Sequence, residues 1–333
     1  MSTLLAPPKT IAGKPVGGIG FGMMGLTLRG TISHGDAIKP MKAALEHGAN
    51  FWNAGTFYGP PDASSLQLLK YYFDTYPEDA TRVVLSIKGA FDGSTGTPHC
   101  KPTDIRTSVD ECLRILAGTK TIDLFECARV DPDVPIEESV STLAELIQEG
   151  KIGSYGLSEV NEATIRRAYA VLPPAAVEVE LSLFSRDVLQ KGGVADTCRE
   201  LGIPLVAYSP LDRGWLTGQL KNPSDLAADD FRLKFGFPRF QPGGAFENNA
   251  KLAKGIAEIA KKMGVTSPQI ALAWVKQQGA LPLPGATKVE RVEENTKEIT
   301  LTKEDLEELQ TQLDSMRVEG NRFPESFQKH LGK

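Results

Sequence analysis

The sequence predicts a single-domain α/β protein whose fold is a (β/α)8 TIM barrel. Eight short apolar runs alternate with amphipathic helical stretches from one end of the chain to the other. The run Val83-Val84-Leu85-Ser86-Ile87 has almost no polar alternation, which is typical of a parallel strand covered on both faces. The 333 residues are enough for one large barrel, and no linker or change of composition divides them. We therefore expect one domain over residues 1–333.

The expected strands follow one another at intervals that leave room for a helix after each of them. In chain order they are Gly18–Phe21, Asn50–Asn53, Val83–Lys88, Ile122–Glu126, Ile152–Gly156, Ala176–Glu180, Pro204–Tyr208 and Leu281–Leu283.

Caps and apolar stripes mark the helices between these strands. Residues 103–118 and 135–150 each carry apolar side chains on one face at helical spacing and end at a glycine. A third helix over residues 266–279 has a Thr-Ser-Pro start, and Thr302 caps a fourth one. Short strands separated by helices of this kind favour a closed parallel barrel over an open sheet.

Two irregular segments interrupt this pattern. Residues 211–245 are rich in Gly, Pro and Phe, and so long a loop in a compact domain usually has a function. The segment follows the seventh strand, so we expect it on the face where barrels keep their active sites. Residues 320–333 form the C-terminal tail.

Composition excludes several classes of partner. A net charge of −5 without a Lys/Arg-rich block argues against nucleic acid. The absence of a signal-like start and of a membrane-length apolar run predicts a cytoplasmic protein that does not enter a membrane. The four cysteines are far apart and form no CxxC pair, so we expect reduced thiols rather than a disulfide or metal site.

Three residues could carry acid chemistry at the carboxyl ends of the strands, where barrels collect their catalytic groups. Asn53 and Lys88 end apolar strands, and Tyr58 lies in the loop after the second strand. A tyrosine has an ordinary pKa of about 10, and a nearby ammonium lowers that value. Tyr58 beside Lys88 could therefore protonate a carbonyl oxygen. Taken alone, the pair could equally be a core tyrosine and a lysine that reaches solvent.

Further motifs resemble those of the aldo-keto reductases, in that family's order and over about nine-tenths of the chain. The stretch Phe51-Trp52-Asn53-Ala54-Gly55-Thr56-Phe57-Tyr58-Gly59 resembles the motif that bears the catalytic acid. The other strand-end signatures are Gly156-Leu157-Ser158-Glu159, Ala176-Val177-Glu178-Val179-Glu180, Ala207-Tyr208-Ser209-Pro210-Leu211, Pro284-Gly285-Ala286-Thr287-Lys288 and Arg291-Val292-Glu293-Glu294-Asn295.

The resemblance implies a nicotinamide cofactor and assigns residues to its parts. Tyr208 would stack on the nicotinamide ring, and Ser158 and Glu178 would hold its carboxamide, with Glu159 and Glu178 standing where many members carry amides. The remaining cofactor residues implied by the resemblance are Gly22, Met23 and Met24 beside the nicotinamide, Ser209, Leu211 and Gly214 along the pyrophosphate, and Gly285, Ala286, Thr287, Lys288, Arg291, Glu294 and Asn295 at the adenosine end.

The charges at the adenosine end favour NADPH over NADH. Lys288 and Arg291 are three residues apart at an expected helix start, where they can pair with a 2′-phosphate. Each could also be an ordinary solvated charge.

Two departures from the general family pattern limit the resemblance to one group within the family. Asn53 stands where the family has an aspartate that pairs with the lysine, and Ala128 stands where it has a histidine. The fungal pyridoxal reductases carry the same two residues within W-N-A-G-x-F-Y-G and C-A-R-V-D. We expect Asn53 to orient Lys88 and Ala128 to leave room near the carbonyl. His99, in the loop after the third strand, could replace the lost donor, and Arg129 is a further candidate for substrate contact.

The resemblance implies reduction of an aldehyde by NADPH, with pyridoxal as the substrate, Tyr58 as the acid and Lys88 as the residue that tunes it. Two alternatives stay open. One is a cofactor-sensing binding protein like the potassium-channel β subunits, and the altered Asn53 and Ala128 keep it in view. The other is a general aromatic aldehyde reductase. The oligomeric state is open.

Overall fold

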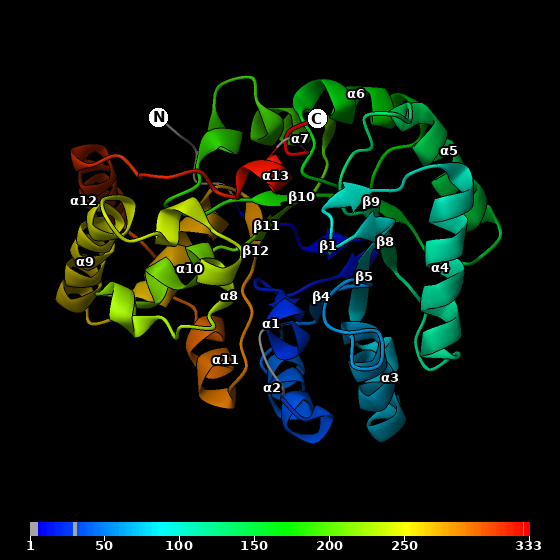
Figure 1. The fold of residues 1–333 in the computed structure, drawn as a ribbon, viewed down its shortest axis with the longest axis horizontal. Helices are drawn as coiled ribbons and strands as arrows, with labels where there is room; N and C mark the ends of the chain where they lie inside the picture. Colours follow the sequence, from blue (N-terminus) through cyan, green and yellow to red (C-terminus); the bar gives the residue numbers. More distant parts are fainter. Residues whose placement is uncertain (1–5, 29–31, 329) are drawn as a thin grey trace.

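The computed structural model describes residues 6–28, 32–328 and 330–333, and it has the predicted (β/α)8 barrel (Figure 1). The barrel strands are β3 (Phe21–Gly22), β4 (Phe51–Gly55), β5 (Val84–Gly89), β8 (Leu124–Cys127), β9 (Tyr155–Ser158), β10 (Ala176–Glu180), β11 (Leu205–Tyr208) and β12 (Ala280–Leu283). Two hairpins lie outside the barrel, β1 (Thr10–Ile11) with β2 (Lys14–Pro15) and β6 (Phe91–Asp92) with β7 (Thr97–Pro98).

Helices surround the strands in the order expected of this fold (Figure 1). They are α1 (Met24–Thr27), α2 (His34–Glu46), α3 (Ser65–Thr75), α4 (Pro102–Leu116), α5 (Ile136–Gln148), α6 (Glu162–Val171), α7 (Val194–Leu201), α8 (Phe231–Lys234), α9 (Ala245–Met263), α10 (Ser267–Gln277), α11 (Val289–Thr296), α12 (Lys303–Ser315) and α13 (Glu325–Gln328). The 3-10 turns are η1 (Pro77–Thr81), η2 (Asp187–Leu189), η3 (Asp212–Thr217), η4 (Pro223–Asp225) and η5 (Pro238–Phe240). The helices predicted over 103–118, 135–150, 266–279 and after Thr302 are confirmed as α4, α5, α10 and α12.

The barrel closes between its first and last strands. All neighbouring strands pair in parallel, in the order β12-β11-β10-β9-β8-β5-β4-β3. The backbone N–H groups of Gly20 and Gly22 donate to the carbonyl oxygens of Pro282 and Pro284 at 2.9 and 3.0 Å. These bonds join β3 to the end of β12 and leave the sheet without a free edge.

The first strand is displaced from its predicted position, Gly18–Phe21, to Phe21–Gly22. Close backbone contacts explain the run of glycines before it. A Cβ on Gly17 would lie 2.0 Å from the carbonyl oxygen of Gly48, and one on Gly20 would lie 3.0 Å from that of Phe51. Glycine is required here for its lack of a side chain, which lets this segment approach the start of β4.

Side chains inside the barrel form an apolar layer below a polar one. Successive strand residues point to opposite faces, so residues two apart both point inward. The lower layer is a buried cluster made of Ile11, Phe51, Val84, Leu124, Ala176, Val206, Leu281 and Leu283. Two positions further along their strands lie Asn53, Ser86, Glu126 and Glu178, all with exposed fractions of 2% or less. Charge and hydrogen-bonding capacity are thus concentrated at the carboxyl ends of the strands.

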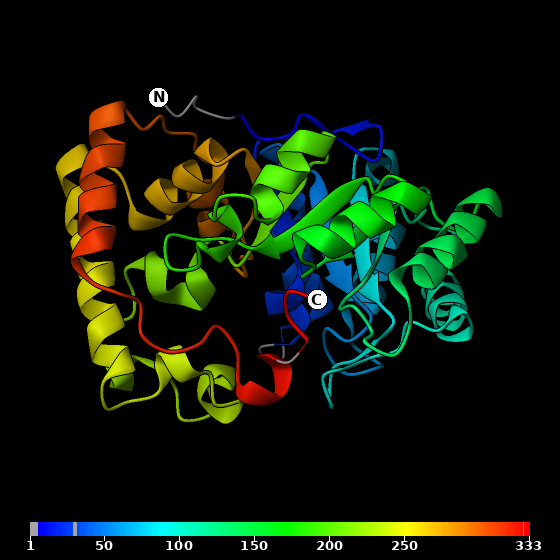
Figure 2. The same ribbon diagram turned by 90° about the horizontal axis from the view of Figure 1, so that it is seen from above.

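Residues 211–245 fold into short turns and α8 and contribute to the wall of a large pocket. Trp215 anchors the segment. Its ring is fully buried and lies 5.3 Å from that of Phe240 and 4.7 Å from that of Phe246, between ring centroids. The C-terminal tail leaves α12 and crosses to α13 beside the barrel (Figure 2). Its last residues reach β9, where Gly332 donates its N–H to the carbonyl oxygen of Glu159 at 3.0 Å. No helix among the described residues has the length and apolar character needed to cross a membrane.

We expect Trp215→Ala to lower the free energy of unfolding by about 3–5 kcal/mol, because it removes a fully buried indole that three aromatic contacts hold in place. Phe235→Ala is the matched control, since Phe235 is 51% exposed in the same segment and should cost below about 1 kcal/mol. Denaturant unfolding at a common slope measures both changes. Equal losses would mean that Trp215 does not anchor this segment.

Candidate active site

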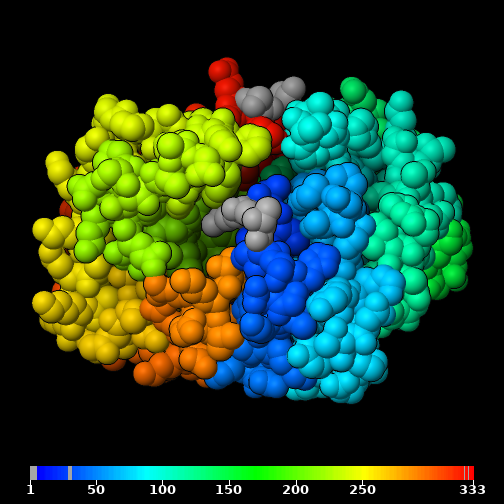
Figure 3. All heavy atoms as spheres, turned by 60° about the horizontal axis from the view of Figure 1, so that its bottom comes forward, coloured from blue at the N-terminus to red at the C-terminus, as the bar shows by residue number. Residues whose placement is uncertain are grey.

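A pocket of about 710 Å³ opens at the carboxyl ends of the barrel strands. Figure 3 shows the hollow between residues 211–245, in yellow-green, and the blue N-terminal part of the chain, with α11 in orange at one side. The volume suits a large organic ligand. Asn53, Tyr58, Lys88 and Glu178 all line this pocket, so the fold brings together the three predicted catalytic residues and one predicted cofactor residue.

Tyr58 lies against the end of β4 and beside Lys88. Its backbone N–H donates to the carbonyl oxygen of Gly55 at 3.1 Å, which turns the ring back over the strand. A Cβ on Gly55 would lie 3.1 Å from three ring atoms of Tyr58, so a larger residue there would crowd the ring. Gly55 pairs in register with Lys88 on β5. The turn that carries the Tyr58 phenol and the end of the strand that carries the Lys88 ammonium therefore lie next to each other.

The buried Lys88 ammonium is paired with Glu178, which reaches it from β10 on another side of the barrel. The Lys88 side chain is 5% exposed and that of Glu178 is fully buried. The other oxygen of Glu178 accepts a hydrogen bond from Asn53 Nδ2 at 3.0 Å, and Asn53 Nδ2 also lies 3.2 Å from Ser86 Oγ. Glu178 thus connects the predicted lysine to the predicted asparagine.

This arrangement corrects the expected role of Asn53. Sequence reasoning expected Asn53 to orient Lys88 directly, but among the described residues Asn53 makes no hydrogen bond to the lysine and instead orients its counter-ion. A carboxylate outcompetes an amide oxygen for a buried ammonium because the ion pair offsets the desolvation of both charges. Glu178, predicted to hold a carboxamide, is therefore engaged with Lys88.

The electrostatics of the pocket keep Tyr58 protonated and Lys88 charged. Burial raises the pKa of Tyr58 and outweighs the lowering by the Lys88 ammonium, so the net direction is opposite to the lowering that was predicted. Burial lowers the pKa of Lys88, but the attraction of Glu178 and other groups outweighs it and leaves that pKa above its ordinary value. Tyr58 can thus act as a proton donor throughout the neutral range.

Sequence reasoning missed Ser86 and Glu126, which complete the polar layer. Burial first, and then the charge of Glu178, raise the pKa of Glu126 well above its ordinary value. A Cβ on Gly156 would lie 3.0 Å from the Glu126 side chain, so glycine at that position leaves space for the carboxyl group. The signal was present in the sequence, since both residues lie at inward positions two residues after Val84 and Leu124.

Most residues of the predicted cofactor set line the same pocket. They are Gly22, Met23, Met24, Glu178, Tyr208, Ser209, Leu211, Gly214, Gly285, Ala286, Thr287, Arg291, Glu294 and Asn295. Ser158, Glu159 and Lys288 are not among the lining residues. Of the predicted substrate residues, Arg129 lines the pocket, Ala128 is fully buried behind it, and His99 is exposed outside it. The placement of His99 argues against it as a replacement donor.

Two of the residues predicted to contact the nicotinamide carry a buried polar atom without a hydrogen-bond partner among the described residues. Within the described part of the chain, Ser158 Oγ and Tyr208 Oη are inaccessible to solvent and have no hydrogen-bond partner. Buried groups of this kind are usually satisfied, so each atom has room for a partner that the described residues do not supply. Of the two residues, Tyr208 lines the large pocket and Ser158 does not. Gly285 faces the backbone of Gly22, where a Cβ would lie 3.2 Å from its carbonyl oxygen. The Tyr208 side chain and the glycine backbone at Gly22 and Gly285 therefore fit a dinucleotide bound along β3, β11 and α11.

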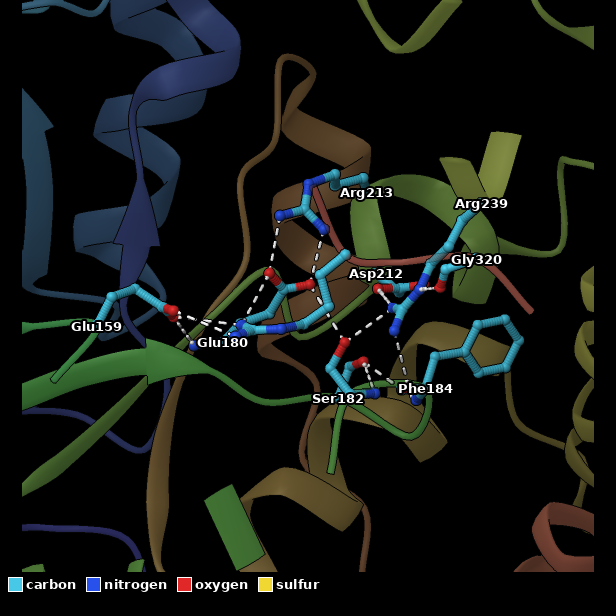
Figure 4. A network of polar contacts seen from close by, with 10 residues as sticks. Glu159, Glu180, Ser182, Phe184, Asp212, Arg213, Arg239 and Gly320 are labelled. Carbon is cyan, nitrogen blue, oxygen red and sulfur yellow. Dashed lines mark hydrogen bonds and ion pairs between the residues drawn. The ribbon is translucent and has the colours of Figure 1, made fainter. Parts of the chain in front are cut away.

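Glu159 belongs to a separate charged network that joins the tail and residues 211–245 to the barrel (Figure 4). Its carboxylate accepts from the N–H of Glu180 at 2.9 Å and pairs with Arg322 of the tail at 3.3 Å. Glu180 pairs with Arg213 at 2.7 and 2.8 Å, and Asp212 pairs with Arg239 at 2.8 Å. Glu159, predicted as a cofactor-binding residue where many family members carry an amide, thus pairs with Arg322 of the tail. Sequence reasoning missed this network because its arginines come from irregular segments.

Comparisons with known proteins identify the family and the fold. The sequence pattern of the aldo/keto reductase family matches residues 18–314. A Schizosaccharomyces pombe protein named probable pyridoxal reductase 2 is 42% identical over 332 residues, which cover 96% of this chain and 98% of the relative. A Saccharomyces cerevisiae protein that is likewise named for pyridoxal reduction is 37% identical and covers 91% of this chain and 95% of its own. A glycerol dehydrogenase of Gluconobacter oxydans shares the fold, with a TM-score of 0.80 at 23% identity over 96% of this chain and 98% of that one. The chain belongs to the aldo/keto reductase family.

Proposed function

We propose that this protein is an NADPH-dependent reductase that converts an aldehyde to an alcohol, with pyridoxal as substrate and pyridoxine as product. The observation that carries the proposal is the meeting of Tyr58, Lys88 and Glu178 at one buried end of the pocket. Family membership supports the coarser part, an oxidoreductase that acts on a small carbonyl compound.

The residues divide the chemistry between them. NADPH, when bound, supplies the hydride that forms the new C–H bond at the carbonyl carbon. Tyr58 Oη donates its proton to the carbonyl oxygen, so the alcohol forms and the tyrosine is left as phenolate. The Lys88 ammonium stabilises that phenolate in a site shielded from water. Glu178 positions the ammonium and keeps it charged, and Asn53 positions Glu178.

The rival function loses part of its basis. The cofactor-sensing alternative rests on Ala128 and on Asn53, which removes the family's carboxylate from β4. Glu178 supplies a carboxylate to Lys88 from β10, so the charge that a working site needs is present at a different position. The support for a reductase is correspondingly stronger.

Aromatic walls and the named relatives favour pyridoxal as the substrate. Phe57, Phe91, Phe323 and Phe327 line the pocket together with Tyr58. The rings of Phe57 and Tyr58 lie 4.9 Å apart, and those of Phe57 and Phe91 lie 4.8 Å apart, between centroids. Such a surface suits a flat aromatic aldehyde. Two relatives that cover nearly the whole chain carry pyridoxal reductase in their names.

We expect Tyr58→Phe to lower kcat with pyridoxal by roughly 10²–10⁴-fold, because it removes the proton donor and little volume. Affinity for NADPH should remain. Tyr71→Phe is the control, since Tyr71 is exposed on α3. Loss of NADPH absorbance with excess pyridoxal measures the rate. Full activity in Tyr58→Phe would contradict the assignment, and tight NADPH binding by an inactive wild type would favour the sensor.

Two substitutions test whether Lys88 needs a carboxylate beside it: Glu178→Gln removes the carboxylate from β10, and Asn53→Asp places one on β4, where the family has an aspartate. Glu178→Gln alone should lower kcat by roughly 10²-fold, because Lys88 loses its buried counter-ion. The alkaline limb of the pH profile should also move to lower pH, since the attraction that raises the Lys88 pKa is gone and the lysine loses its proton earlier.

The double variant Asn53→Asp/Glu178→Gln should recover most of the rate and the original alkaline limb, because one carboxylate again faces the lysine. Steady-state kinetics over pH compare the three proteins. A double variant no better than Glu178→Gln would mean that Glu178 acts in some way other than as the counter-ion.

We expect Lys288→Ala/Arg291→Ala to raise the Kd for NADPH by roughly 10–100-fold and the Kd for NADH much less, because both cations can pair with a 2′-phosphate. Arg291 now pairs with Glu294 at 2.5 Å, so its loss also leaves a carboxylate near the phosphate. Lys297→Ala, at the other end of α11, controls for net charge. Fluorescence titration measures each Kd. Equal weakening of both cofactors would remove the reason to prefer NADPH.

A further inference from the structure

Arg129 brings a positive charge into the pocket, and it pairs with no carboxylate in the part of the chain that the structure describes. It lies two residues after the end of β8, and its guanidinium contacts the rings of Phe91 and Phe323, 5.9 and 5.8 Å from their centroids. It makes one hydrogen bond, from Nη1 to the carbonyl oxygen of Ala128 at 2.5 Å. That bond uses one of the five N–H donors of an arginine.

The other cations that line the pocket are all neutralised. Their ion pairs are Lys88–Glu178, Arg213–Glu180, Arg232–Asp230 and Arg291–Glu294. Within residues 6–28, 32–328 and 330–333, no carboxylate oxygen lies within 4.0 Å of the Arg129 guanidinium. Glu159 is near enough to be influenced by Arg129, but its oxygens pair with Arg322. Among the described residues that line the pocket, Arg129 is therefore the cation that has no carboxylate counter-ion.

The surroundings of Arg129 also place it beside the reacting end of the pocket. Phe91 contacts Phe57, and Phe57 contacts Tyr58, so a continuous aromatic wall runs from the proposed acid to the guanidinium. The charge of Arg129 is one of those that act on Tyr58. An aromatic aldehyde whose carbonyl oxygen meets Tyr58 would lie along this wall with a ring substituent toward Arg129.

We propose that Arg129 is an anion-binding residue of the substrate pocket and that its ligand is an anionic oxygen on the ring of an aromatic aldehyde. The proposal rests on the proposed reductase function and specifies its substrate class. A partly buried cation without a partner is costly, and an anionic ligand that replaces water there offsets this cost. The planar guanidinium suits a carboxylate, a phosphate or a phenolate. Pyridoxal fits, because its ring hydroxyl is next to the aldehyde and is acidic.

The alternative is that Arg129 is a structural fastener, which holds Phe323, and hence the tail, over Phe91. The two roles differ in one measurable respect. A fastener would support all aldehydes equally, whereas an anion-binding residue would distinguish anionic from neutral ones. The test therefore compares matched substrates rather than a single rate.

The experiment measures kcat/KM for two substrate pairs with wild type, Arg129→Met and Arg129→Lys. One pair is 4-carboxybenzaldehyde and the neutral 4-nitrobenzaldehyde. The other is pyridoxal and pyridine-4-carboxaldehyde, which lacks the acidic ring hydroxyl together with the neutral methyl and hydroxymethyl groups. Arg114→Met, at an exposed arginine of α4, is the control for net charge. We expect Arg129→Met to lower kcat/KM for the anionic member of each pair by roughly 10–100-fold through KM, and for the neutral member by less than about 3-fold. Arg129→Lys should recover part of the loss.

The results distinguish a carboxylate from a phenolate as the ligand, and the anion-binding role of Arg129 from the fastener role. A loss confined to 4-carboxybenzaldehyde would support a carboxylate ligand, and a loss confined to pyridoxal would support a phenolate. Equal loss for anionic and neutral aldehydes would overturn the proposal in favour of the fastener, while the reductase function would stand. If the wild type reduces no aldehyde, the reductase function fails. Calorimetric titration with benzoate and with benzyl alcohol then tests anion binding by Arg129. Tighter binding of benzoate that is lost in Arg129→Met would support the proposal. Equal binding of the two compounds by the wild type would overturn it.

Discussion

The ion pair between Lys88 and Glu178 is the interaction on which the rest of the site depends. Lys88 is needed next to Tyr58, and the fold buries its ammonium almost completely. A buried ammonium without an anion would lose its proton or destabilise the barrel. Glu178 prevents both outcomes from the opposite side of the barrel, and Asn53 fixes its second oxygen. The altered asparagine of the catalytic motif is therefore part of a working charge arrangement rather than a gap in one.

A second set of charges couples the irregular segments to the barrel. Glu180, two residues after Glu178 on the same strand, binds Arg213 from residues 211–245 and Arg322 from the tail. Burial raises the pKa of Glu180, but these arginines outweigh it and lower that pKa to about 2. The carboxylate consequently stays charged at any ordinary pH. One strand thus positions the reacting lysine and also holds the two segments that form the pocket wall.

The sequence was sufficient for the barrel because strand and helix patterns are local. Unbroken apolar runs, helix caps and glycines at helix ends all operate within a few residues, so they predict the eight strands with shifts at the strand ends. It also indicated which strand ends carry the chemistry. The partner of Lys88 was not predictable in the same way, since Glu178 is 90 residues away and meets the lysine only when the barrel closes. The same limit applies to Glu159, whose bond to Arg322 spans 163 residues.

The buried Glu126 explains why an asparagine suits β4. Glu126 and Glu178 both lie near the single ammonium of Lys88. Burial first, and then the charge of Glu178, raise the pKa of Glu126 well above its ordinary value, so the site disfavours a second carboxylate beside the lysine. An aspartate at position 53 would add a third carboxyl group, only 3.0 Å from Glu178 if it replaced the amide without movement. Like charges so close cannot all be ionised. The amide at position 53 avoids that repulsion and donates a hydrogen bond to Glu178 instead, so an asparagine suits the place beside the carboxylate that pairs with Lys88.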